Sequence, residues 1–241
     1  MRKATIFTGQ WADLPLETVA QKMQQFGYDG LELACWGDHF DVFKGAADPA
    51  YCQAKKELLA KYGLGVWAIS NHLAGQLICD PNFDSRSDGF APAECAGNPE
   101  AKREWAIESM KNAARAAKNM GIDVVNGFTG SPIWHMLYSF PPVSKETIAD
   151  GFKYFADLFN PILDVFAECG VKFALEVHPT EPLPEDYPFL KLDNVTLTTH
   201  RGGATINAYC DSPEMLLVDY ARYLAGKKPR FFVNPEVGYG K

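Results

Sequence analysis

Residues 172–179 read Lys-Phe-Ala-Leu-Glu-Val-His-Pro, and this stretch decides the fold. Its apolar run of Phe, Ala, Leu and Val is typical of a strand that is buried on both faces of a parallel sheet. Glu176 and His178 stand two residues apart, so their side chains point to the same face of the strand. Pro179 cannot donate to the ladder and ends the strand. Because an unpaired buried carboxylate is costly, we expect Glu176 to have a cation, a donor or a function.

The composition is that of an ordinary globular chain with enough apolar material for a large core. Of the 241 residues, 47% are hydrophobic and 22% are charged. A net charge of −7 and a pI near 5.3 give no electrostatic footprint for nucleic acid or an anionic membrane. The six cysteines are scattered without a C-x-x-C pair, and no apolar run is long enough to span a bilayer. We therefore expect a cytoplasmic protein without nucleic-acid or membrane partners.

Short apolar runs alternate with amphipathic helices upstream of the opening stretch. We expect strands at 4–8, 30–35, 66–70, 124–128 and 172–177, and helices at 16–26, 49–62, 99–120 and 144–169. A long loop is expected from 73 to about 98. The alternation predicts an α/β protein with a parallel sheet, either a TIM-type barrel or an open doubly wound sheet. Polar residues follow several of the strands, at the sheet edge where both architectures place active sites.

With these residues in view, the first 180 residues resemble the xylose-isomerase-like TIM barrels, a family of sugar phosphate isomerases and epimerases. The resemblance rests on Asp-Gly-Leu-Glu-Leu-Ala at 29–34, Ile-Ser-Asn-His at 69–72 and Ala-Leu-Glu-Val-His-Pro at 174–179. It implies a sugar or cyclitol substrate and a divalent metal (Mn, Mg, Co or Zn) that Glu176 binds. It also implies proton transfer next to a carbonyl that the metal polarises, with Glu176 as a candidate acid/base.

Four other residues are candidates for substrate binding: Glu32, Trp36, His72 and His178. Each has a structural alternative. His72, which ends the third predicted strand, would suit a substrate or metal contact or only a structural role in its loop. Glu32 is placed like a site residue, but it would also suit a hydrogen-bonded brace of the barrel rim. His178 would suit a metal ligand, a substrate contact or a satisfied core histidine. Trp36 would equally pack in the core or at the rim, and His39, beside two aspartates, is expected to be solvated.

The chain is expected to form an incomplete barrel. Only 62 residues follow Pro179, whereas three further βα units need roughly 90 by the usual size of such barrels. We therefore predict a partial TIM barrel of about five βα units over residues 1–180 and a separate segment over 181–241. Residues 195–199 are expected to add a sixth strand beside 173–177.

The segment after residue 180 is similar to the carboxyl end of D-isomer-specific 2-hydroxyacid dehydrogenases, and we expect it to form a strand-helix segment of that type. The similarity rests on Glu-Pro at 181–182 and on a Thr-x-His-x-Gly-Gly stretch around His200. It implies that Glu181 and His200 descend from a catalytic dyad. No dinucleotide-binding glycine motif follows the first predicted strand, so NAD is not expected to bind.

Three functions follow from these resemblances. The first is a sugar isomerase or epimerase that acts by metal-assisted proton transfer and is impaired by the missing barrel strands. The second is a non-catalytic chimeric or assembly protein, which would form homo-oligomers through open sheet edges. The third is the remnant of an NAD-dependent 2-hydroxyacid dehydrogenase.

Overall fold

The structure is a computed structural model that describes residues 3–136, 139–176, 222, 225 and 227. Contacts within the chain divide it into two units, Met1–Glu185 and Asp186–Lys241. All of the helices and strands below belong to the first unit. The predicted dehydrogenase-like strand and helix, and the sixth strand at 195–199, lie outside the described residues. The boundary near residue 180 stays a prediction.

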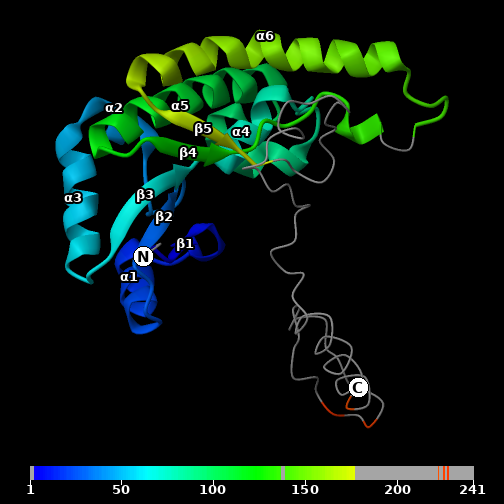
Figure 1. Ribbon diagram of the computed structural model, residues 1–241. Helices are drawn as coiled ribbons and strands as arrows, with labels where there is room; N and C mark the ends of the chain where they lie inside the picture. The colour runs from blue at the N-terminus through cyan, green and yellow to red at the C-terminus, as the bar shows by residue number, and fades with distance from the viewer. Residues whose placement is uncertain (1–2, 137–138, 177–221, 223–224, 226, 228–241) are drawn as a thin grey trace. The chain divides into compact units, whose positions relative to one another are not determined.

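Five parallel strands form one sheet in strict chain order (Figure 1). They are β1 (Thr5–Phe7), β2 (Gly30–Ala34), β3 (Gly65–Ser70), β4 (Val124–Gly127) and β5 (Lys172–Leu175). Each strand pairs in parallel with the next, and one register shift lies between β2 and β3 at Leu31/Glu32. A doubly wound sheet reverses its strand order at a switch point, whereas a TIM barrel keeps chain order. The described unit is therefore a partial TIM barrel, as the sequence predicts.

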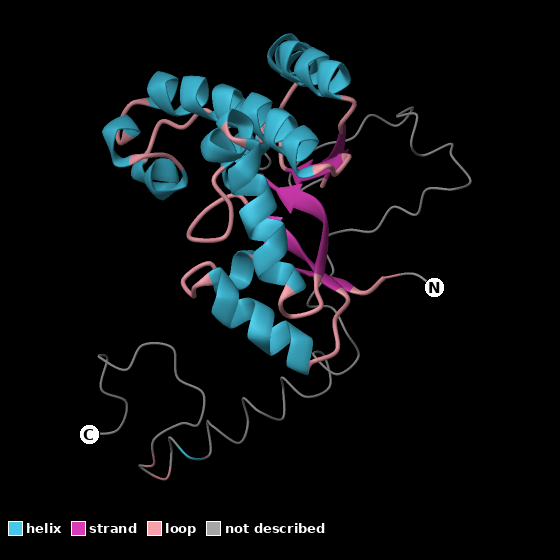
Figure 2. Ribbon diagram, turned by 90° about the vertical axis from the view of Figure 1, so that its left-hand side faces the viewer, coloured by secondary structure: helices cyan, strands magenta, loops and turns pink. Residues whose placement is uncertain are grey.

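The helices gather on one side of this sheet (Figure 2). They are α1 (Leu16–Gln25), α2 (Val42–Ala47), α3 (Pro49–Ala60), α4 (His72–Cys79), α5 (Pro99–Met120) and α6 (Lys145–Cys169). The core lies between strands and helices and includes Leu31, Leu33, Ile69 and Val125, all fully buried. The apolar side chains are thus buried between the two layers, and polar side chains such as Asn71 and His72 follow the carboxyl ends of the strands.

Helix α4 corrects the predicted long loop, which begins only after Cys79. Leu73 apart, the apolar side chains of α4 are buried against the sheet: Ala74, Leu77 and Ile78 are at most 1% exposed. Gly75 lies among them because a Cβ there would come within 2.1 Å of the carbonyl oxygen of Phe128. A glycine that looks like a loop residue in sequence is thus a contact point between α4 and the loop after β4.

Two predictions about partners stay open after this description. Within the described residues, β1 and β5 each have one strand neighbour, so both are edges of the sheet as described. Homo-oligomers through these edges remain a prediction. None of the described helices is long and apolar enough to cross a membrane.

A candidate active site at the carboxyl ends of the strands

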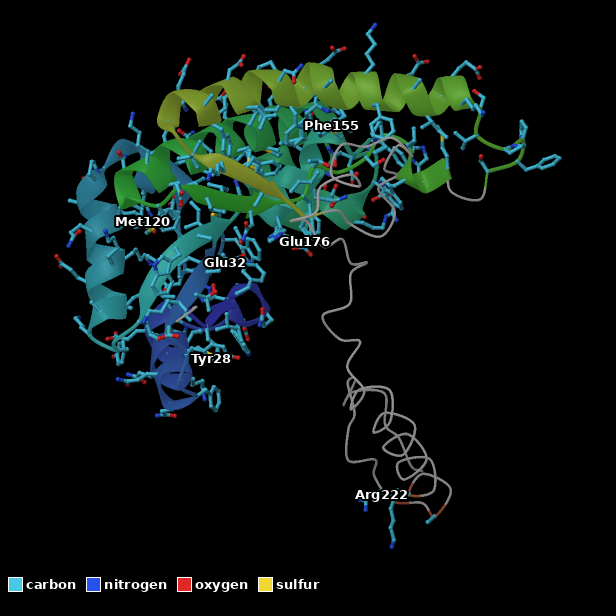
Figure 3. The ribbon with its side chains drawn as sticks, viewed as in Figure 1. Tyr28, Glu32, Met120, Phe155, Glu176 and Arg222 are labelled. Atoms are coloured by element: carbon cyan, nitrogen blue, oxygen red, sulfur yellow. The ribbon has the colours of Figure 1, made fainter. Side chains whose placement is uncertain are left out.

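His72 and Glu176 meet although 104 residues separate them in sequence. His72 begins α4 directly after β3, and Glu176 directly follows β5 at the tip of its arrow in Figure 3. The two atoms Nε2 of His72 and Oε2 of Glu176 are 3.1 Å apart. A carboxylate can only accept, so the imidazole donates through Nε2–H. The parallel sheet therefore brings together the acid of the opening stretch and the histidine that follows the third strand.

Aromatic rings surround the imidazole of His72. Three rings make edge-to-face contacts with it, at ring-centroid distances of 5.2 Å for Phe7, 4.5 Å for Phe128 and 6.4 Å for Trp36. The His72 side chain is 7% exposed, whereas that of Glu176 is 46% exposed. The pair therefore has a buried imidazole and a carboxylate that solvent or a ligand can reach.

Burial decides the protonation of His72. Desolvation lowers its pKa below the usual value of 6.5, and the nearby Glu176 and Glu32 carboxylates oppose this shift without reversing it. The imidazole is therefore neutral near pH 7. Its contact with Glu176 is a hydrogen bond from a neutral ring rather than an ion pair. With Nε2 protonated, Nδ1 carries a lone pair, and it has no hydrogen-bond partner among the described residues.

Glu32 is held by its neighbour on the next strand. The hydroxyl of Ser70 donates to Oε1 of Glu32, which joins β2 to β3 on the same side of the sheet. Figure 3 shows Glu32 to the left of Glu176 and slightly lower in that view. Of the two predicted roles, this contact favours the brace, and the influence of Glu32 on the pKa of His72 shows that it lies near the pair.

His39 is not solvated, and the prediction for it is wrong. It is fully buried, with Nδ1 2.9 Å from Oγ1 of Thr8 and Nε2 3.1 Å from the carbonyl oxygen of Leu14. The Thr8 hydroxyl in turn accepts from the amide of Ala34. Both ring nitrogens are thus occupied in joining the loops after β1 and β2.

A cavity of about 420 Å³ adjoins His72 on the α4 side. Its walls are His72 and Phe128 at one end and the loop after α4 with Trp134 at the other. The buried Lys102 fixes this loop, because its ammonium contacts Asp88, the Ser87 hydroxyl and the Asp84 carbonyl. The sequence predicts a long loop here, of a length that is typical of functional or disordered segments, but none of its residues was named as a site residue.

Of the remaining predicted site residues, three lie outside the described residues and Trp36 lies near the pair. His178, Glu181 and His200 lie outside the described residues. Trp36 lies near His72, as the predicted substrate-binding role requires, and it also packs edge-on against Phe7 at 5.7 Å. These ring contacts of Trp36 therefore fit both predicted roles, substrate binding and packing at the rim.

The described residues do not fit a metal centre. No group of three His, Cys, Asp or Glu side chains among them is placed to hold an ion. Divalent metals in proteins take four to six ligands or more, and the pair of Glu176 and His72 offers two side chains already bonded to each other. Glu176 as a metal ligand therefore stays a prediction.

Known proteins resemble the chain in two different ways. Glyoxylate reductase from Thermofilum pendens is 41% identical over 64 residues, which make up 27% of this chain and 19% of that protein. A solved D-tagatose 3-epimerase-like protein is 16% identical, with a TM-score of 0.48 over 74% of this chain and 54% of its own. A solved 3-keto-D-glucoside 4-epimerase from E. coli is 14% identical, with a TM-score of 0.48 over 75% of this chain and 58% of its own. The chain thus spans little more than half the length of these solved structures.

The family assignment comes from sequence. Residues 20–187, more than half of the chain, match the profile of the family described as xylose isomerase-like TIM barrel. This range contains both His72 and Glu176, and it ends close to the end of the first unit. The chain belongs to the xylose isomerase-like TIM barrel family.

Proposed function

We propose that the described unit is a sugar isomerase- or epimerase-like site that moves a proton next to the carbonyl of a small sugar or cyclitol. The observation that carries the proposal is the 3.1 Å contact between Nε2 of His72 and Oε2 of Glu176 at the carboxyl ends of β3 and β5. The family to which the chain belongs supports the class of substrate.

The two residues of the pair have different parts in this proposal. The side chain of Glu176 is 46% exposed, so a ligand can reach its carboxylate, and it is the group that takes the proton. His72 is a positioning residue for it: the neutral ring donates one hydrogen bond and is itself held among three aromatic rings. The single N–H donor of the ring holds the carboxylate in one orientation.

The metal predicted from the family resemblance has no step in this proposal, because the described donors do not make a site for it. The proton transfer can be tested without assuming that a metal is bound. The chain is incubated in D₂O with D-fructose, and separately with myo-inosose, and deuterium entering next to the carbonyl is followed by NMR. Parallel samples contain Mn²⁺, Mg²⁺, Co²⁺ or EDTA, which tests the predicted cofactor directly.

The expected result is deuterium exchange that falls about 100-fold or more in Glu176→Gln, the size of a lost general base. Glu57→Gln is the matched control. The Glu57 carboxylate lies on α3 and accepts a hydrogen bond from the side-chain amide of Gln53 on the same helix. Exchange that is unchanged in Glu176→Gln, or absent with both compounds under every metal condition, would contradict the proposal.

A second function is favoured by one observation, the 41% identity to glyoxylate reductase over 64 residues. It supports an origin of part of the chain in the dehydrogenases that the segment after residue 180 resembles. The dyad residues inferred from that resemblance, Glu181 and His200, lie outside the described residues. Binding of NADH, followed by its fluorescence on titration with the chain, is the test; an unchanged signal removes this function.

A further inference from the structure

The described residues contain three buried side-chain polar atoms without a hydrogen-bond partner, and all three belong to residues that line one cavity. The atoms are Nδ1 of His72, Oδ1 of Asn82 and Nε1 of Trp134. His72 and Asn82 are 6% and 7% exposed. A buried polar atom left unpaired costs free energy, so three of them around one space of about 420 Å³ indicate that a ligand completes them.

The hydrogen-bonding role of each atom is fixed by its neighbours. Nδ1 of His72 accepts, because the ring is neutral and its proton is on Nε2, which donates the hydrogen bond to Glu176. Oδ1 of Asn82 accepts, because the amide nitrogen of the same side chain donates to the carbonyl of Leu77 at 2.6 Å and thereby sets the amide orientation. Nε1 of Trp134 donates. Burial raises the pKa of the nearby Asp80 carboxyl, and Trp134 is among the groups that oppose this shift, but its Nε1 does not reach hydrogen-bonding geometry.

This pattern suits hydroxyl groups and not a phosphate. Two acceptors and one donor require a ligand that both donates and accepts, and each hydroxyl of a polyol does so. A phosphate dianion carries only acceptors at neutral pH and would leave both protein acceptors unpaired.

The charges of the cavity lead to the same conclusion. Among the described residues that line it, the cationic side chain is Arg86, and its guanidinium is already bonded to the Asp84 carboxylate. The guanidinium also stacks 5.4 Å from the ring of Trp134, which fixes its position. Asp80 adds a second carboxylate, which the Gln76 amide and the Ser131 backbone N–H hold. An incoming phosphate would meet two carboxylates and one satisfied cation.

We propose that this cavity is a subsite for the uncharged polyhydroxy part of a sugar or cyclitol without phosphate, and that Asn82 and Trp134 are its specificity-determining residues. The inference rests on the proposed function for the kind of compound that the chain handles. It goes beyond that function by separating free sugars from sugar phosphates. The rings of Phe128 and Trp134 add apolar surface for the C–H faces of such a ligand.

The test is calorimetric titration of the whole chain with three probes: D-fructose, myo-inositol and D-fructose 6-phosphate. We expect at least one neutral compound to saturate the chain and the phosphate ester to bind about tenfold more weakly than D-fructose. Trp134→Phe keeps the ring and removes the N–H, and the loss of one hydrogen bond weakens binding of the neutral compound about three- to tenfold.

Two further variants complete the design. Asn82→Gly removes the second polar group and tolerates the backbone φ of +56° at this position, and it should weaken binding by a similar factor. Trp67→Phe is the matched control, since this tryptophan lies on β3 against Gly30 and Gly65 and does not line the cavity. It should leave binding unchanged, and circular dichroism of every variant checks the fold.

Three results would overturn the inference. They are tighter or equal binding of D-fructose 6-phosphate, binding that ignores both Trp134→Phe and Asn82→Gly, and no saturation by either neutral compound up to about 100 mM. The titration is separate from the deuterium-exchange assay. Specific binding without exchange refutes the proposed function alone, whereas exchange that neither variant affects refutes the subsite alone.

Discussion

Two buried histidines, His39 and His72, lie next to strands of the same sheet and differ in one respect. Burial lowers the pKa of both, so both rings are neutral near pH 7. The ring of His39 has a partner at each nitrogen, the Thr8 hydroxyl and the Leu14 carbonyl. The ring of His72 has one partner, Glu176; its second nitrogen has none among the described residues, and the residue lines a cavity. Burial and a shifted pKa are thus common to a structural and a candidate functional histidine, and the unpaired nitrogen distinguishes them.

The largest expected effect of this difference is on stability. His39→Leu leaves the Thr8 hydroxyl and the Leu14 carbonyl without their partner in a buried setting, and each such loss costs about 1–3 kcal/mol. We expect the free energy of unfolding to fall by about 2–4 kcal/mol, as measured by urea denaturation.

His72→Phe is the counterpart that sharpens the comparison. Phenylalanine keeps a ring among Phe7, Trp36 and Phe128, removes an unpaired nitrogen, and releases a half-exposed Glu176 that water can solvate. We expect the free energy of unfolding to change by less than about 1 kcal/mol. Equal losses in the two variants would show that the two histidines are structurally equivalent and would break the distinction.

The sequence predicts much of the frame because its signals are local. Helix α5 runs over Pro99–Met120 as expected, since Asn98 accepts from the first-turn amides and Gly121 takes the left-handed conformation at its end. The meeting of His72 and Glu176 follows from the same reasoning. Both come at carboxyl ends of parallel strands, so the topology places them at one edge of the sheet.

The features that the sequence did not predict depend on distant partners. Beside Asp38 and Asp41, His39 looks solvated, but its hydrogen bonds go to residues 25 and 31 positions away. The cavity beside His72 has the same origin. Its Asn82 lies in a loop without periodicity, and a buried lysine on α5 holds that loop in place. A pattern of neighbours cannot show which polar atoms of such a loop end without a partner.

Gly75 offers a smaller test, because it decides how closely α4 approaches the wall of the cavity. In an exposed helix, Gly→Ala stabilises by about 1 kcal/mol. Here the new Cβ would lie 2.1 Å from the carbonyl oxygen of Phe128, so the helix must move away. We expect Gly75→Ala to lower the free energy of unfolding by about 2 kcal/mol and to weaken sugar binding at the same time.

Gly89→Ala is the control for this change. Gly89 lies in the loop after α4, which contributes other residues to the cavity lining, and nothing stands within 4 Å of a Cβ placed there. Urea denaturation of both variants checks the prediction. A stabilised Gly75→Ala protein would show that α4 and the loop after β4 are not in the close contact described here.

The smallest expected effect is a dependence of stability on pH that the two histidines share. Their folded-state pKa values lie below the value of about 6.5 for an exposed histidine, so the unfolded chain binds protons that the folded chain does not. The free energy of unfolding should therefore be highest above that pKa and should decline as the pH falls from about 7 toward 5. Removing one of the two groups reduces this slope. In His72→Phe we expect a shallower decline than in the original chain, measured by urea denaturation at several pH values in that range. An unchanged slope would mean that His72 titrates alike in both states and that its ring is less buried than its surroundings of Phe7, Trp36 and Phe128 imply.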